Sequence, residues 1–290
     1  PRSGHCLGCG RSRSEIAAWG GADGATRRRM WQDSDARAAA LGLPLRLVDR
    51  SPDQILDWAA WTLDASAGTW VLGAPGATAE LVRSSAEPCY THRDGHRLEG
   101  QTPRAAFRLD AAADLRAFQW IDAYAGAGAP AERTVLTAPL DDGWQPCHTI
   151  TPLGADLAAV IPAARTQHLV DLGVGGPAAR FCIRTGDETL LQALTEARGL
   201  ALVEALPRLA PLMTRISPTR VITTAAARVE ILTPIPAPDG RSPDGPHTHL
   251  LPDLIAAGRP TPPGLALPTG YPLAAIFYPN TPSAVIGSRP

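Results

Sequence analysis

The spacing of polar and apolar residues near the N-terminus predicts two short helices. Ser12 and Glu15 form an S-x-x-E capping box, so a helix should begin at about Arg13. A pair of glycines ends it, and a second helix is expected over roughly residues 24–40. Two short helices bury little surface, so this module, residues 1–45, needs a metal ion or a partner surface to stabilise it.

Segments with a helical period and segments with a strand period alternate over residues 46–290. Ser51-Pro52-Asp53 should open a helix, because the apolar residues that follow have a 3.6-residue period. Further helices are expected at residues 77–83, 112–124 and 188–198. Strands are expected at residues 69–72, 104–109, 134–137, 170–174, 180–184, 220–223, 228–233 and 273–277. We therefore predict an α+β fold for residues 46–290, in which helices pack on a mixed and mainly antiparallel sheet. The alternative to one undivided domain is a boundary between two subdomains near residue 150.

The segment from Thr233 to Pro272 follows neither period. It contains eleven prolines, which exclude long helices and central strands. We expect a Pro-rich loop over residues 233–272. It either wraps the surface or presents the polar residues at its centre, with proline reducing the entropy lost on ordering.

Composition restricts the function without naming it. The chain has 290 residues, of which 44% are hydrophobic and 19% charged, and a net charge of −1. We expect no nucleic-acid partner because basic charge is not in excess, and no membrane partner because no apolar run approaches ~20 residues. All 27 basic residues are arginine, so chemistry that needs lysine, such as Schiff-base formation, is excluded.

The cysteines suggest a metal site. Five is an odd number, and no export signal is visible, which favours reduced thiols and a cytoplasmic location over a disulfide framework. Cys6 and Cys9 form a C-x-x-C pair just before a helix, a spacing that can chelate one zinc ion. Structural zinc takes four ligands, so the pair is half a site. Candidates for the other ligands are His5, Cys89, Cys147 and Cys182. The alternative is a pair of unligated cysteines.

The stretch C-x-G-C-x-R-S-x-x-E-I-x-x-W, from Cys6 to Trp19, resembles domain-of-unknown-function family 1289. The resemblance covers residues 4–41, and Arg27 occupies one of the family's basic positions. Thr26 stands where the family has Glu, and family members usually carry further cysteines upstream of the pair. The resemblance implies metal binding and no particular reaction.

A second candidate site lies in the Pro-rich loop, where S-P-D-G-P-H-T-H contains His247 and His249. Side chains two apart on an extended backbone project to the same side, ~6.5–7 Å apart, so the two imidazoles can share a metal ion. Asp244 and Asp253 are candidate third ligands. The alternative is a rigid loop whose histidines bond to backbone carbonyls. Residues 228–280 also resemble a stretch in bacterial proteins that contain S-P-[DE]-G-P-H-T-H, which implies no activity.

Two hypotheses follow. The first is a non-enzymatic, zinc-binding protein with a helical metal-knuckle module at Cys6 and Cys9 and an α+β body that binds an unknown protein or small-molecule partner. The second is a metalloenzyme of unknown reaction that uses His247 and His249. We favour the first because the sequence contains no G-x-S-x-G, H-E-x-x-H or paired-carboxylate motif. The sequence identifies neither a substrate nor an oligomeric state.

Overall fold

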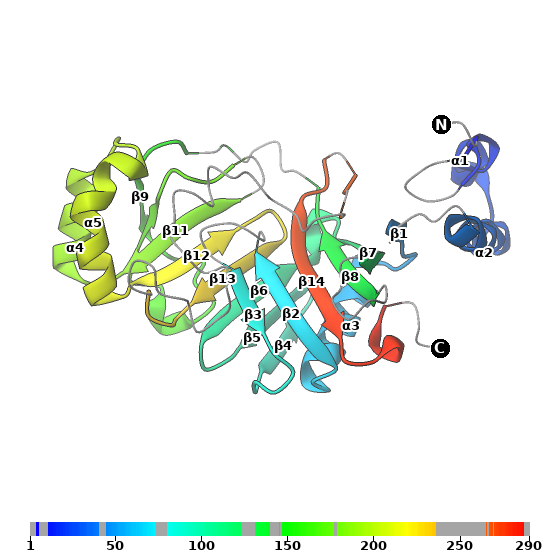
Figure 1. The fold of residues 1–290 in the computed structure, drawn as a ribbon, viewed down its shortest axis with the longest axis horizontal. Helices are drawn as coiled ribbons and strands as arrows, with labels where there is room; N and C mark the ends of the chain where they lie inside the picture. The colour runs from blue at the N-terminus through cyan, green and yellow to red at the C-terminus, as the bar shows by residue number, and fades with distance from the viewer. Residues whose placement is uncertain are drawn as a thin grey trace.

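Two antiparallel sheets form the body of the protein, and helices lie at both ends of it (Figure 1). The computed structural model describes residues 4–5, 11–40, 45–73, 80–122, 131–139, 145, 147–176, 179–235, 265, 267–268 and 270–286. The α+β class predicted from the sequence is confirmed. The single sheet that was expected is instead two sheets, and every strand pairing in the described residues is antiparallel.

The described helices and strands have the following bounds. The α-helices are α1 (Arg13–Ala18), α2 (Gly24–Ala40), α3 (Pro52–Asp64), α4 (Glu188–Glu196) and α5 (Leu202–Ile216). The strands are β1 (Leu45–Leu47), β2 (Gly68–Gly73), β3 (Glu80–Arg83), β4 (Tyr90–Asp94), β5 (Arg97–Gln101), β6 (Ala105–Asp110), β7 (Arg116–Asp122), β8 (Ala131–Thr137), β9 (Thr151–Ala155), β10 (His168–Asp171), β11 (Arg180–Thr185), β12 (Thr219–Thr223), β13 (Ala227–Ile231) and β14 (Leu273–Pro279). Short 3₁₀ turns are η1 (Trp19–Gly21), η2 (Ala111–Ala113), η3 (Pro162–Ala164) and η4 (Pro282–Ala284).

The six-stranded sheet has the order β1-β7-β8-β14-β2-β3, and α3 packs into the same core. Helix α3 begins where predicted, because Ser51 forms a capping box with Gln54. Its Trp58 meets Trp70 and Phe277 in a ring cluster with centroids 5.1–5.4 Å apart. Aromatic groups at these separations contribute more than their buried area alone, so this cluster is the centre of the first core.

The eight-stranded sheet has the order β4-β5-β6-β13-β12-β11-β10-β9, and its two faces differ. Phe107, Ile183 and Val229 are buried on the apolar face. The first core covers this face at one end, and α4 and α5 cover it at the other, where they form a second core. Figure 1 shows α4 and α5 at the end farthest from α1 and α2. The opposite face of this sheet, which we call the polar face, carries the charged residues described below.

Two predicted helices are wrong. Residues 80–83, expected at the end of a helix, form β3, and residues 112–124 contain β7 instead of a helix. The alanine-rich start of the second segment favours a helix locally. The exact pairing of Phe118 and Trp120 with β1 and β8 buries both rings, and this tertiary gain outweighs the local preference.

Helix α5 was not predicted, because Pro207 and Pro211 lie inside it. Proline removes a backbone donor and normally disrupts a helix interior. Here an apolar stripe keeps the helix in place: Leu209 and Met213 are buried against the sheet together with residues from α4. Packing of this face therefore offsets the lost hydrogen bonds.

Candidate functional site

A network of buried charges connects the polar face of the eight-stranded sheet to the loop that follows β9. Arg184 on β11 donates to Asp156 at 3.1 Å and to Glu230 on β13 at 2.6 Å. Arg228 on β13 donates from Nε to Glu230 at 2.7 Å and from Nη2 to Asp156. All four side chains are at most 7% exposed. Buried charges of this kind require partners, and here each is paired with two opposite charges.

The network fixes the covering loop, which we define as residues 156–165. Glu230 accepts a hydrogen bond from the Val160 N–H at 2.8 Å, and Arg108 Nη1 donates to the Ala158 carbonyl at 3.0 Å. Burial alone would raise the pKa of Glu230, but the charges of Arg184 and Arg228 outweigh it and hold this pKa below its ordinary value. Glu230 therefore stays ionised and holds the loop on the sheet.

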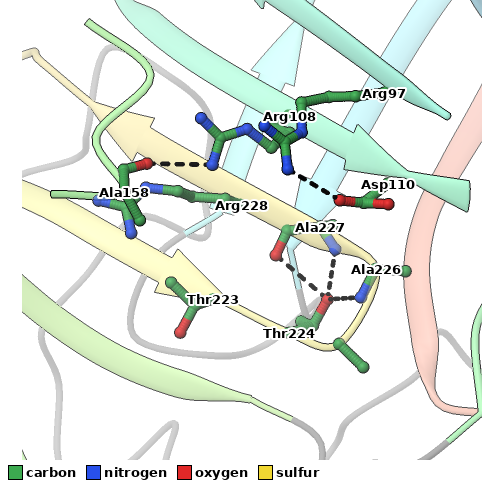
Figure 2. Close-up of a pocket in the computed structure, with 10 residues that line it drawn as sticks. Arg97, Arg108, Asp110, Ala158, Thr223, Thr224, Ala226, Ala227 and Arg228 are labelled. Carbon is green, nitrogen blue, oxygen red and sulfur yellow. Dashed lines mark hydrogen bonds and ion pairs between the residues drawn. The ribbon is translucent and has the colours of Figure 1, made fainter. Parts of the chain in front are cut away.

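A pocket of about 190 Å³ opens beside this network, at the turn between β12 and β13 (Figure 2). Its charged and hydroxyl-bearing lining consists of Arg97, Arg108, Asp110, Thr223, Thr224 and Arg228. Alanines 158 and 225–227 complete the wall. Thr224 holds the turn closed by accepting hydrogen bonds from the N–H groups of the two alanines at 226 and 227, at 3.3 and 2.9 Å. The described lining of the pocket thus presents three guanidinium groups and one carboxylate.

A second polar group on this face surrounds Asp171 on β10. Its side chain is 1% exposed, its Oδ1 accepts from the Gly173 N–H at 2.9 Å, and its Oδ2 lies 3.7 Å from Arg180 Nε. Burial raises the pKa of Asp171. Burial, together with a hydrogen bond to Asp171, also raises the pKa of the Cys147 thiol. Cys147 is therefore held as a thiol and is not an activated nucleophile.

The N-terminal module is held together by local contacts. Ser12 and Glu15 form the predicted capping box of α1, and Arg37 of α2 donates to both carboxylate oxygens of Glu15 at 2.6 and 2.8 Å. Burial alone would raise the pKa of Glu15, but the hydrogen bonds from Arg37 and Ser12 lower it overall. The backbones of His5 and Ser12 form an isolated β-bridge, so the chain on either side of residues 6–10 is brought together.

Comparison with known proteins places most of the chain in one family. Residues 54–288 match the family described as "Family of unknown function (DUF6925)". The chain belongs to this family. Residues 2–38 of this DUF6925 protein match "Protein of unknown function (DUF1289)", which confirms the resemblance found in the sequence. No curated protein and no solved structure matches the chain.

The metal ligands predicted from the sequence fall outside the part of the DUF6925 chain that the structure describes. Cys6 and Cys9 lie in residues 6–10, and His247 and His249 lie in residues 236–264, so all four remain predictions. The first of the two segments falls within the DUF1289 match, and the second falls within the DUF6925 match.

The other three cysteines, Cys89, Cys147 and Cys182, form no metal cluster with residues that the structure describes. Within the described part of the chain, no three His, Cys, Asp or Glu side chains are placed to hold a metal ion. Burial raises the pKa of Cys89 to about 11 and also raises that of Cys182. Both thiols are therefore neutral when no metal is bound. Coordination to zinc would itself deprotonate a thiol, so Cys89, Cys147 and Cys182 remain predicted ligands.

Two further histidine-region contacts are structural. Gly95 and His96 form the turn of the β4–β5 hairpin, between the paired residues Asp94 and Arg97, with Gly95 at φ +51°. His96 Nδ1 lies 3.1 Å from Asp53 Oδ1 at the start of α3. Across the described ranges, no helix is both long and apolar enough to cross a membrane.

The pocket of this DUF6925 protein was not predicted from the sequence. Two of its three arginines, Arg108 and Arg228, come from AAFRLD (β6) and ARVEI (β13), two strands in which charged residues alternate with apolar ones, and Arg97 begins β5. That alternation could have indicated one polar face. The sequence carries no signal that these two strands are neighbours in register, so the pocket follows only from the fold.

Proposed function

We propose that the N-terminal module binds zinc through the thiolates of Cys6 and Cys9, and that the α+β body is the part that binds a ligand or a partner. In this proposal the protein catalyses no reaction, and it is a binding protein whose N-terminal module is stabilised by a metal ion. The metal would supply the folding energy that two short helices lack.

One observation carries the zinc proposal. His5 precedes the cysteine pair, and its Nδ1 is buried without a hydrogen-bond partner among the described residues. A buried ring nitrogen with no partner is costly, and coordination to a metal removes that cost. The β-bridge between His5 and Ser12 supports the same conclusion, because it closes the chain around the segment that carries both cysteines. His5, Cys6 and Cys9 form a donor set of nitrogen and sulfur, which zinc prefers.

The experiment is elemental analysis of the purified full chain, compared with two double variants. In Cys6→Ser/Cys9→Ser the zinc content should fall to background, whereas His247→Ala/His249→Ala should retain it. A third variant, His5→Ala, should weaken zinc retention against a chelator. Loss of zinc only in the histidine double variant would replace this proposal by the metalloenzyme hypothesis, and a zinc-free wild-type protein would contradict both.

A further inference from the structure

We propose that the pocket at the β12–β13 turn binds a small oxyanion, namely the carboxylate or phosphate group of a small molecule. The pocket is lined by Arg97, Arg108 and Arg228, and Thr223 is part of the same lining. This site lies in the body, goes beyond the zinc proposal and does not depend on it. Guanidinium groups are suited to oxyanions because their planar donors match carboxylate and phosphate oxygens.

The strand register concentrates positive charge at this point. Arg108 on β6 lies directly opposite Arg228 on β13, and Arg228 lies directly opposite Thr223 on β12. Arg97 on β5 is opposite Asp110, so it is the diagonal neighbour of Arg108. Like charges directly opposite each other destabilise a sheet. Glu99 and Glu230 compensate part of that repulsion, and an anion between the arginines would reduce what remains.

The lining of the pocket carries an excess of positive charge. Three arginines face it and Asp110 is its one carboxylate among the described residues. Two of these arginines are oriented by carboxylates that do not line the pocket, Glu99 for Arg108 and Glu230 for Arg228. Their bonds fix the guanidinium groups in place, so little side-chain entropy remains to be lost when an anion binds.

Some hydrogen-bond donors of the residues that line the pocket have no acceptor among the described residues. Arg228 is 7% exposed, and its Nη1 donates to no acceptor in the described part of the chain. The Thr223 hydroxyl makes no hydrogen bond to any described residue either. Arg97 is 48% exposed and makes one long contact, 3.4 Å to Asp110. A bound oxyanion can accept from all three groups without breaking the network that holds the covering loop.

The volume limits the size of the ligand. Pockets that enclose drug-sized molecules measure ~300–1,000 Å³, whereas this one measures about 190 Å³. It therefore holds one charged group with a few additional atoms, and any larger remainder of the ligand must extend into solvent past Arg97. Inorganic phosphate and malonate are small enough to enter completely, so they are suitable probes.

A purely structural role for the same arginines makes a different prediction. If Arg108 and Arg228 serve only to hold the covering loop through Ala158 and Asp156, Arg97 and Thr223 have no part in it and the pocket takes no anion. Arg97→Gln and Thr223→Val therefore separate the two roles, since neither residue contacts the covering loop through a described hydrogen bond.

The test is isothermal titration calorimetry of the full chain with inorganic phosphate and, separately, with malonate, at constant ionic strength set by chloride. Arg208→Gln is the matched control, because Arg208 is also an exposed arginine paired with one carboxylate, on α5. At least one probe should bind the wild type and Arg208→Gln with a dissociation constant of about 1 mM or lower. Arg97→Gln and Thr223→Val should each weaken binding, the first by about tenfold, the effect of one charged hydrogen bond.

The outcomes distinguish the possibilities. Binding of phosphate alone identifies a phosphorylated ligand, and binding of malonate alone identifies a carboxylate. Absence of binding by both probes overturns the proposal, as does equal binding by all three variants. Circular dichroism shows whether Arg97→Gln is folded, and Thr223→Val decides the result if it is not. Cys6→Ser/Cys9→Ser should bind the probe as the wild type does, so failure of the zinc proposal is seen separately.

Discussion

Arg108 and Arg228 lie directly opposite each other on the neighbouring antiparallel strands β6 and β13. Each donates to acidic partners: Arg108 to Glu99 on β5, and Arg228 to Glu230 and Asp156. Glu230 is fully buried and accepts from two arginines and one backbone N–H. Glu230 therefore makes more hydrogen bonds in the network than its other described carboxylate, Asp156.

Replacing the Glu230 carboxylate should be strongly destabilising. Glu230→Gln leaves Arg184 and Arg228 buried with less compensating charge, and we expect the free energy of unfolding to fall by about 3–5 kcal/mol. Urea unfolding measures this loss. Glu132→Gln is the control, because Glu132 is 39% exposed and lies 3.7 Å from Arg46, a surface pair worth about 1 kcal/mol or less. Equal effects of the two changes would show that the buried network does not support the fold.

Gly100 and Phe107 provide a second test, through packing. They are cross-strand partners on β5 and β6, and a Cβ at position 100 would lie 2.1 Å from the Phe107 ring. Gly100→Ala should therefore destabilise the protein by about 1–3 kcal/mol, the usual effect of overpacking. Gly186→Ala is the control, since its nearest neighbour would be Gln167 at 3.5 Å. A melting temperature unchanged by Gly100→Ala would contradict the packing described for this sheet.

Local signals predicted the parts of the fold that depend on neighbours in sequence. The capping boxes at Ser12 and Ser51 placed the starts of α1 and α3, because a cap is made within one helical turn. Strands β12 and β13 were also predicted, because each has a strong alternation of its own. These elements are determined by interactions between residues that are close in the sequence.

The sequence could not show features that depend on distant partners. The segment that forms β7 has a helical composition and becomes a strand only because β1 and β8 flank it. Helix α5 contains two prolines and is stabilised by the second core. The pocket brings Arg108 and Arg228 together across strands far apart in the chain. The zinc ligands Cys6 and Cys9 remain a prediction from the motif.

Asp171 should control the reactivity of Cys147. The hydrogen bond and negative charge of Asp171 both help to raise the pKa of this thiol, after burial. Asp171→Asn should therefore lower the Cys147 pKa and speed its alkylation by iodoacetamide, followed by mass spectrometry. Asp114→Asn is the control, because Asp114 is exposed and paired with Arg116. Unchanged Cys147 labelling in Asp171→Asn would contradict the contact between the two side chains.

The carboxylates of Glu230 and Asp171 should make the free energy of unfolding depend on pH in opposite directions. The folded-state pKa of Glu230 lies below its ordinary value of 4.5, so its contribution is present above 4.5 and is lost as pH falls through the folded pKa. Asp171 has a folded-state pKa above its ordinary value of 3.8, so its contribution is present below 3.8 and is lost as pH rises through the folded pKa. Urea unfolding between about pH 3 and pH 8 measures both effects.

Asp171→Asn separates these two contributions. Asparagine keeps an oxygen that can accept from the Gly173 N–H, at 2.9 Å in the wild type, and it cannot ionise. At pH 7 the variant should be at least as stable as the wild type, because the unfavourable buried charge is gone. At the acid end its advantage should disappear, since Asp171 is then protonated in the wild type too. A variant that is less stable than the wild type at pH 7, by the same amount as at the acid end, would mean that the Asp171 charge is well solvated or paired in the native protein.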